Sequence, residues 1–442
     1  MRVAWFSPLP PDTSGIAAYS AEVVPCLGER IGAVDLYSPR LPGTPAHVLH
    51  PTEFGWRHRR SPYDLTVYQL GNSPAHDFMW GFLFRYPGLV VLHDAQIHQA
   101  RALWLLRRLE PRLSDYLEEV RASHPGAPSD LGYLFAAGLG GDLFRLWPLV
   151  SLVLRASRLT AVHNARLAGS LAEAHPDAAI TSLEMGTADP LGDRTLPDDG
   201  ESIRARYRIP PDTLVVGAYG GITPEKRIPQ LLTAVAALDP SRPVHVLLVG
   251  QRAGHYDVDA DIVRLGLSTR VHIAGYVSNE ALPAHLAAAD LCWCLRWPSN
   301  GETSASWIRC LGAGRPTLIT ALAQLQDVPV LAADALDELG EDAAINAVGI
   351  AIDPLDEAGE VVAALTALVR QPHLRQALGK QARSYWEGRH TLPRMADAYA
   401  RLMEEAATRP VPELPLPSHH RDTGDTTAVR ILAEMGIGGL PW

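Results

Sequence analysis

The sequence is poor in cysteine and has no long apolar run. Its 442 residues include four cysteines, with no Cys-x-x-Cys pair and no histidine at zinc-finger spacing. This excludes a disulfide scaffold and a zinc finger, and we expect free thiols in a reducing compartment. The longest apolar candidate, Leu146–Leu154, is far shorter than the roughly 18 residues that a membrane span needs. Because Val3–Phe6 predicts a strand where a leader peptide would lie, we expect a cytoplasmic protein.

Positive charge is also scarce. There are 39 Lys and Arg residues against 49 Asp and Glu, and the formal net charge is −10. A nucleic-acid-binding protein usually has a basic surplus, so we do not expect a nucleic-acid partner. Hydrophobic residues make up 47% and charged residues 20% of the chain. That balance is typical of a globular protein, and the length favours two or three domains.

The dominant pattern is a short apolar run followed by a turn and a helical segment. Continuous apolar strands that alternate with helices predict βαβ units and parallel sheets covered on both faces. We therefore expect an α/β protein with two doubly wound, Rossmann-like domains facing a central cleft. The predicted strands are Val3–Phe6, Leu65–Tyr68, Leu89–His93, Leu159–His163, Ile180–Glu184, Leu214–Tyr219, Val244–Val249, Arg270–Ala274, Leu291–Leu295, Thr317–Thr320 and Val348–Ile352.

Changes in composition suggest the domain boundaries. We expect a first domain at 1–185, with a helical insertion at 96–157, and a Pro/Gly-rich linker at 186–200. The strand–helix pattern restarts in a second domain at 201–390, and a closing helix follows at 391–408. Residues 409–442 form a Pro-rich tail that we expect to be partly disordered.

The first segment with chemical potential is the strand end Tyr219-Gly220-Gly221, followed by Lys226. Glycines at a strand end let a ligand approach the backbone, and a lysine there can neutralise a phosphate. The 39 basic residues include only two lysines, Lys226 and Lys380, which suggests that a compact point charge is needed at this junction. The alternative is a solvated lysine at a helix start.

The second segment, Arg296–Arg309, joins a predicted strand to a helix. Gly301, Thr303 and Ser304 leave the first helical amides open, and these amides together with the helix dipole favour an anion. Thr303 or Ser304 as an ordinary N-cap is the structural alternative, and both can hold together.

In combination, these motifs resemble the retaining glycosyltransferases of family 4, which have two Rossmann-like domains in the GT-B fold. The resemblance rests on Gly-Ile-Thr-Pro-Glu-Lys-Arg-Ile, Pro-Ser-Asn-Gly-Glu-Thr-Ser-Ala, the opening loop Pro10–Ser20 and Val91-Leu92-His93-Asp94. It implies transfer of a sugar from a nucleotide-diphosphate sugar with retention, the first domain facing the acceptor. No metal cofactor is expected, and no Asp-x-Asp motif is present to hold one.

The resemblance also implies roles for particular residues. Lys226 would neutralise the diphosphate, His93 would contact a sugar hydroxyl, and Glu302 would present the helix start to the sugar. The remaining implied donor contacts are Gly15, Ile16, Gly220, Gly221, Gly275, Tyr276, Val277, Gly301, Thr303, Ser304 and Arg309. His163 is a further, weaker candidate at a strand end.

Three positions depart from the family pattern. Gly221 stands where the family has an arginine, and Gly301 and Arg309 stand where it has two glutamates. An arginine cannot accept hydrogen bonds from ribose, so the nucleotide is left open, and Arg309 could replace the charge lost at Gly221.

Two alternatives to transfer remain: a GT-B sugar-nucleotide epimerase and a homologue that binds sugar nucleotide without turnover. A Rossmann dehydrogenase is excluded because no strand is followed by Gly-x-Gly-x-x-Gly. The acceptor can be a glycan, a lipid-linked sugar or a small molecule. Arginines in 56–60 and 101–112 suit either a solvated face or a peripheral contact with a membrane.

Overall fold

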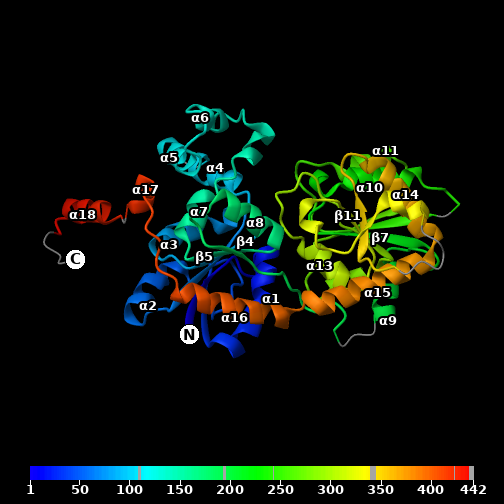
Figure 1. The fold of residues 1–442 in the computed structure, drawn as a ribbon, viewed down its shortest axis with the longest axis horizontal. Helices are drawn as coiled ribbons and strands as arrows, with labels where there is room; N and C mark the ends of the chain where they lie inside the picture. The colour runs from blue at the N-terminus through cyan, green and yellow to red at the C-terminus, as the bar shows by residue number, and fades with distance from the viewer. Residues whose placement is uncertain (108–110, 193–195, 242, 339–344, 423, 438–442) are drawn as a thin grey trace.

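The computed structural model describes residues 1–107, 111–192, 196–241, 243–338, 345–422 and 424–437. Two α/β domains lie side by side, and a long helical segment runs beneath both of them (Figure 1). Each domain is built on a parallel sheet with helices on its two faces, as the alternating pattern predicts.

The described part of the first domain contains a sheet in the order β2-β1-β3-β4-β5-β6, with every pairing parallel. β1, β3, β4 and β5 are buried almost throughout, which matches their continuous apolar sequences. The strands are β1 (Arg2–Phe6), β2 (Ala33–Tyr37), β3 (Leu65–Leu70), β4 (Leu89–Leu92), β5 (Leu159–Val162) and β6 (Ile180–Ser182).

The helices of the first domain include one from the far end of the chain. α16 (Leu392–Thr408) crosses back and packs on α1 (Gly15–Ile31), where Tyr399 and Met403 are fully buried in the core of this domain. The closing helix therefore completes the N-terminal domain and ties the two domains together. The other helices here are α2 (Phe54–Arg60), α3 (Trp80–Arg85), α8 (Ala165–Ala174) and the short 3-10 helices η1 (Pro51–Glu53) and η2 (Pro74–Met79).

The insertion is helical but not helical throughout, contrary to the expectation for 96–157. Pro125 and Pro128 break it after α5, and Gly138 and Gly141, both with positive φ, break it after α6. The result is a set of short helices above the first sheet (Figure 1). They are α4 (His98–Leu106), α5 (Leu113–Ser123), α6 (Leu131–Ala136), η3 (Gly141–Leu146) and α7 (Ser151–Ala156).

The described part of the second domain contains a parallel sheet in the order β12-β13-β11-β10-β7-β8-β9. Its central strands carry an aliphatic core of Val216, Val246, Leu248, Leu291 and Leu318. The strands are β7 (Leu214–Tyr219), β8 (Val244–Val249), β9 (Val271–Gly275), β10 (Leu291–Trp293), β11 (Thr317–Thr320), β12 (Leu331–Ala332) and β13 (Gly349–Ile352).

The helices of the second domain begin inside the expected linker, because α9 starts at Leu196. The helices are α9 (Leu196–Arg206), α10 (Ile228–Ala237), α11 (Val258–Arg264), α12 (Leu282–Ala288), α13 (Ala305–Gly312), α14 (Glu357–Arg370), α15 (Pro372–Arg389) and the 3-10 helices η4 (Pro224–Lys226), η5 (Ala323–Leu325) and η6 (Ala333–Glu338).

The described part of the tail holds two helices. Leu414 and Leu416 pack on the N-terminal core, and α17 (Ser418–Arg421) lies against α5. α18 (Asp425–Glu434) extends away from the body (Figure 1). Across the described residues, no helix has the length and apolar character to cross a membrane.

Candidate functional site

The carboxyl ends of the two sheets face each other across a large cavity of about 470 Å³. We call it the Tyr276 cavity. Its walls come from the loop before α1 on one side and from the ends of β7, β8 and β9 on the other. In doubly wound folds, ligands bind in this place because the strand ends leave a crevice lined by loops. The predicted residues that line it are Gly15, Gly220, Gly221, Tyr276, Val277 and Arg309.

The start of α1 is prepared for close approach by a ligand. Ser14 caps the helix, its Oγ accepting from Ala17 N at 3.2 Å. A Cβ added at Gly15 would meet nothing within 4 Å, so this residue borders open space at the cavity wall. Ile16, the next predicted contact, lines no described cavity and instead approaches Gly71.

A smaller cavity, the Lys226 cavity, adjoins the first one beside Gly220 and Gly221. Gly220 has φ 93°, and a Cβ there would overlap Lys226 Nζ. A glycine is therefore required both for the backbone conformation and for the space that the ammonium occupies. The same overlap shows that Lys226 Nζ lies directly under the strand-end loop.

Lys226 is fixed from both ends. Its Nζ donates to the carbonyl oxygen of Tyr219 at 2.8 Å, and its own carbonyl oxygen accepts from Trp293 Nε1 at 2.9 Å. Burial, with a smaller contribution from Arg296, lowers the pKa of Lys226 to about 8. A bound anion would stabilise the buried ammonium and raise its pKa again, so the site favours a negatively charged ligand.

Arg296 is a residue that the sequence analysis missed. It follows β10, lines the Lys226 cavity together with Ser304 and Ser306, and pairs with Glu302. Burial alone would raise the pKa of Glu302, but Arg296 and hydrogen bonds from the loop keep it below its usual value. The signal that could have found Arg296 is a lone arginine directly after a strand facing the cleft.

The loop 296–304 is anchored to both domains. Ser304 is the N-cap of α13, its Oγ accepting from Trp307 N at 3.3 Å, as the N-cap alternative predicts. Thr303 Oγ1 donates to the carbonyl oxygen of His163, and Asn164 Nδ2 donates to the carbonyl oxygen of Gly301 at 2.9 Å. The α13 start therefore faces the cleft while its loop touches the opposite domain.

Glu302 faces its own loop. Besides its pairing with Arg296, its carboxylate accepts from Ser299 Oγ at 3.0 Å and from the backbone N of Asn300 at 2.7 Å. These contacts shape the loop. A carboxylate can accept more than these three bonds, so a direct contact between Glu302 and a sugar, as the family resemblance implies, needs no exchange of them.

His93 lies at the end of β4 in a chain of polar contacts. Its Nε2 is 2.8 Å from Gln69 Oε1, and its Nδ1 is 3.2 Å from Nε2 of His163. Burial first, and then His163 and His76, lower the pKa of His93 far below its usual value, so the ring is neutral. Both ring nitrogens are already engaged, and His93 lines none of the cavities described here.

Asp94, the neighbour of His93, also connects the domains. Its Oδ1 accepts from Gln96 N at 2.9 Å and from Asn300 Nδ2 at 3.1 Å. Burial raises the pKa of Asp94 to about 6. Asp94 was not among the predicted site residues, although it belongs to the His93-Asp94 motif.

Arg309 makes a contact between domains. Its Nη2 lies 2.5 Å from Glu22 Oε1 on α1, and both side chains are largely buried. Arg309 still lines the Tyr276 cavity, but Glu22 balances its charge. Tyr276 is 56% exposed at the cavity wall, and Gly275 ends β9 with φ 73°.

The described residues contain one cluster with metal-ligand geometry, formed by Glu119, His419 and His420. It lies where the tail meets α5, away from the cleft. Arg101 donates to the same carboxylate through Nε at 3.0 Å, and both histidines lie 2.9 Å from Glu119 Oε1. These contacts satisfy the carboxylate without an ion, so the cluster is a docking contact for the tail.

Comparison with solved structures defines the class of fold. Sucrose-phosphate synthase from Thermosynechococcus elongatus has a TM-score of 0.62 at 16% identity and covers 92% of this chain and 98% of its own. WaaG, a glycosyltransferase of lipopolysaccharide biosynthesis, has a TM-score of 0.60 at 15% sequence identity, and the match covers 91% of this chain and 99% of WaaG. The Anabaena protein HepE, in complex with UDP and glucose, has a TM-score of 0.58 at 16% sequence identity, and the match covers 91% of this chain and 99% of HepE. The chain therefore has the GT-B fold.

Sequence comparison narrows the class. Residues 199–302 match the family described as Glycosyl transferases group 1, and this segment contains Gly220, Lys226, Arg296 and Glu302. The 2-deoxystreptamine glucosyltransferase of Streptomyces kanamyceticus is 28% identical over 176 residues, which is 37% of this chain and 45% of that protein. The match spans less than half of the curated relative. Within the GT-B fold, residues 199–302 of the C-terminal domain are thus similar to group 1 glycosyltransferases.

Proposed function

We propose that this chain is a glycosyltransferase that transfers a sugar from a nucleotide-diphosphate sugar to an acceptor with retention of configuration. The observation that carries the proposal is that Lys226 and Arg296, which is itself paired with Glu302, both line a cavity under the glycines of a cleft between two Rossmann-like domains. Two cations beside a helix start suit a diphosphate, and the adjoining Tyr276 cavity has room for a nucleoside.

The chemistry that these residues support is stabilisation of a leaving group. As the acceptor oxygen bonds to the anomeric carbon, the bond from that carbon to the diphosphate breaks and its electron pair leaves with the phosphate. Lys226, Arg296 and the amides at the start of α13 would take up the developing negative charge. No metal ion is needed in this proposal, because fixed protein charges do this work.

We propose UDP-glucose as the donor to test first. HepE is solved with UDP and glucose, and the curated relative is a glucosyltransferase. In this chain, Tyr276 and Val277 would contact the base, and Gly15 would allow the α1 start to approach the sugar phosphate. Glycan, lipid-linked and small-molecule acceptors all remain within this proposal.

The direct test is a calorimetric titration with UDP-, GDP-, ADP- and dTDP-sugars, in Mg²⁺ and in EDTA, followed by an assay for free sugar release. We expect one nucleotide to bind equally in both buffers and to release sugar slowly. Binding without any transfer or release would favour a non-catalytic homologue, and formation of an epimer would favour an epimerase. Failure of every sugar nucleotide to bind would sink the proposal.

Retention has its own test, which uses Asp94. An inverting enzyme needs a base for the acceptor proton, and Asp94 is the carboxylate nearest in sequence to His93. With retention, the departing diphosphate takes that proton. Asp94→Asn keeps an oxygen that can accept from Asn300, so we expect kcat to fall by less than about tenfold. A fall in kcat of about 10³-fold would identify Asp94 as a base. An inverted anomeric coupling in the product's NMR spectrum would overturn retention.

A further inference from the structure

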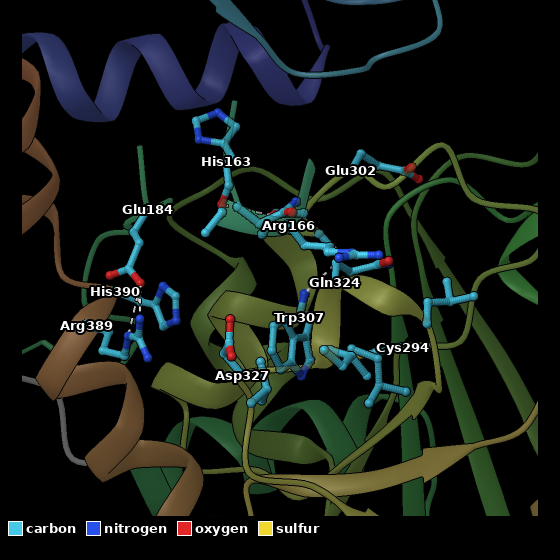
Figure 2. A pocket seen from close by; sticks show the side chains of 18 of the residues that line it. His163, Arg166, Glu184, Cys294, Glu302, Trp307, Gln324, Asp327, Arg389 and His390 are labelled. Atoms are coloured by element: carbon cyan, nitrogen blue, oxygen red, sulfur yellow. Dashed lines mark hydrogen bonds and ion pairs between the residues drawn. The ribbon is translucent and has the colours of Figure 1, made fainter. Parts of the chain in front are cut away.

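A third cavity, of about 130 Å³, lies on the other side of the loop 296–304. We call it the Trp307 cavity (Figure 2). Its walls come from the ends of β5 and β6 in the first domain and from β10, β11 and η5 in the second. None of the predicted donor contacts on the Tyr276 cavity line it. The predicted site residues Glu302, Thr303 and Ser304 do line it.

The Trp307 cavity is adjacent to the place where the leaving group would depart. Arg296 and Ser304 line both this cavity and the Lys226 cavity. His163 lines it as well, and its Nε2 contacts His93. A molecule in the Trp307 cavity would thus lie one side chain away from a diphosphate held by Lys226.

The lining combines aromatic faces with groups that accept hydrogen bonds. Trp307 and Tyr385 provide the aromatic surface, together with aliphatic side chains such as Leu322. Small-molecule sites commonly combine an apolar surface with a few placed polar groups. The charged side chains balance, with three arginines (Arg166, Arg296, Arg389) and three carboxylates (Glu184, Glu302, Asp327).

His390 gives the sharpest indication of a ligand. Its ring is only 7% exposed, its Nδ1 lies 2.8 Å from the carbonyl oxygen of Met185, and its Nε2 has no hydrogen-bond partner among the described residues. Burial lowers the pKa of His390, so the ring is neutral. Since Nδ1 must carry the proton to donate to a carbonyl, Nε2 has a buried lone pair without a partner among the described residues, in a residue that lines the cavity. Figure 2 shows His390 beside Glu184 and near Asp327.

We propose that the Trp307 cavity is the acceptor site and that it takes a single-ring polyol, a sugar or a cyclitol. The proposal rests on the proposed transferase function. A ring of hydroxyls offers donors to His390 Nε2 and to the carboxylates, while its carbon face packs on an aromatic ring. At about 10–15 Å³ per water, the cavity has room for about ten waters, comparable to one six-membered polyol ring. The balanced charges favour a neutral molecule.

In the transfer step, a ring hydroxyl oxygen forms the new bond to the anomeric carbon. The bond from that carbon to the diphosphate oxygen breaks, and its electron pair stays on the diphosphate. The hydroxyl proton passes to the released diphosphate, so that the step is balanced without a further reactant.

The test uses the full chain and two readouts. Ligand-observed NMR measures binding of myo-inositol and glucose against the linear polyol sorbitol, without donor. A second assay follows transfer from UDP-glucose to the same polyols, beside acceptor-independent release of glucose. Leu322→Trp would fill the cavity, His390→Phe would remove the lone pair at similar volume, and Leu41→Trp on an exposed loop is the matched control.

We expect a ring polyol to bind more tightly than sorbitol, and Leu322→Trp and His390→Phe each to raise the acceptor KM at least about tenfold. UDP-glucose affinity and acceptor-independent release should stay within about twofold, since no predicted donor contact changes. Equal binding of sorbitol, or unchanged acceptor KM in both variants, would overturn the acceptor site. Ring-polyol binding without any sugar-nucleotide binding would instead overturn the transferase function.

Discussion

The two domains present opposite chemistry to the cleft that they share. The C-terminal domain offers glycine backbone and cations: Gly220 makes room for Lys226, and Arg296 lies beside it. The N-terminal domain contributes neutral imidazoles at its strand ends, because burial lowers the pKa of His76 and of His163 to about 4 and the pKa of His93 well below its usual value; of the three, His163 lines the Trp307 cavity. The cations of the proposed phosphate site therefore come from the C-terminal domain, and the buried neutral imidazoles come from the N-terminal domain.

This difference suggests which part of the proposed reaction each domain serves. The charged leaving group would be held where cations are fixed before the ligand arrives, which avoids reorganisation during reaction. The acceptor would lie in the Trp307 cavity, which both domains line and where His163 contributes a neutral ring. Changes to C-domain residues should therefore affect donor affinity first, and changes to N-domain residues should affect turnover first.

The largest effect should come from Lys226→Ala. The variant loses a charge fixed against the strand-end loop, and we expect kcat/KM to fall about 10³-fold with donor affinity weakened as well. The matched control is Lys380→Ala, which removes the chain's other lysine at an exposed position on α15. Steady-state kinetics and calorimetry measure both. If Lys226→Ala and Lys380→Ala behave alike, the phosphate site lies elsewhere.

His93→Ala should give the next largest effect, on the other domain. The ring orders Gln69 and His163 at the strand ends, and we expect kcat to fall about tenfold to a hundredfold. The Kd for UDP-glucose should change less than about twofold. A parallel loss of affinity and turnover would show that the two domains do not divide the work. Circular dichroism checks that the buried site still folds.

Much of this fold could be predicted from the sequence, for a physical reason. Buried parallel strands need apolar residues on both faces, so β1, β4, β5, β7 and β8 stand out as continuous runs. β2 was missed because it is an edge strand with an exposed start and a central Asp35, which interrupts the apolar run.

The candidate site could be predicted only where it is local in the sequence. The glycines, Lys226 and the N-cap Ser304 lie within short motifs, and the structure places them together. Contacts between distant segments could not be predicted. The Glu22–Arg309 pair joins residues 287 apart, and the Trp307 cavity exists only because α15, η5 and β6 converge. Arg296 was overlooked because the loop was interpreted as a helix start alone.

Arg296→Gln should sharpen the assignment of charge to the C-terminal domain. The amide keeps a hydrogen bond to Glu302 but removes the second cation of the Lys226 cavity. We expect UDP-glucose affinity to fall about tenfold, close to the worth of one charge-assisted contact. Affinity for uridine, which has no phosphate, should not change. An equal loss for uridine would mean that the substitution disturbs the loop and not the charge.

The pH dependence of donor affinity should follow Lys226. Its pKa of about 8 in the free protein means that the ammonium is lost as pH rises through this value. The Kd for UDP-glucose should therefore rise with a slope approaching about tenfold per pH unit above 8. The free energy of unfolding changes in the opposite direction. The lysine of the unfolded chain titrates at about 10.4 and keeps its proton between the two pKa values, so the free energy of unfolding rises with pH in this range. Lys226→Arg should flatten the affinity profile, and an unchanged profile would contradict the assignment.

The smallest effect should come from Arg309, at the boundary between the two domains. Arg309→Glu introduces the residue that the family resemblance favours, but it places two carboxylates where Arg309 and Glu22 now pair at 2.5 Å. Repulsion between them should loosen domain closure, and we expect kcat/KM to fall about threefold to tenfold. Glu22→Arg in the same chain restores an opposite pair and should recover most of the loss. Small-angle X-ray scattering would show whether the single variant is more extended. If Arg309→Glu raises activity and Glu22→Arg then removes the gain, the carboxylate serves the nucleotide and the pair is not a clamp between the domains.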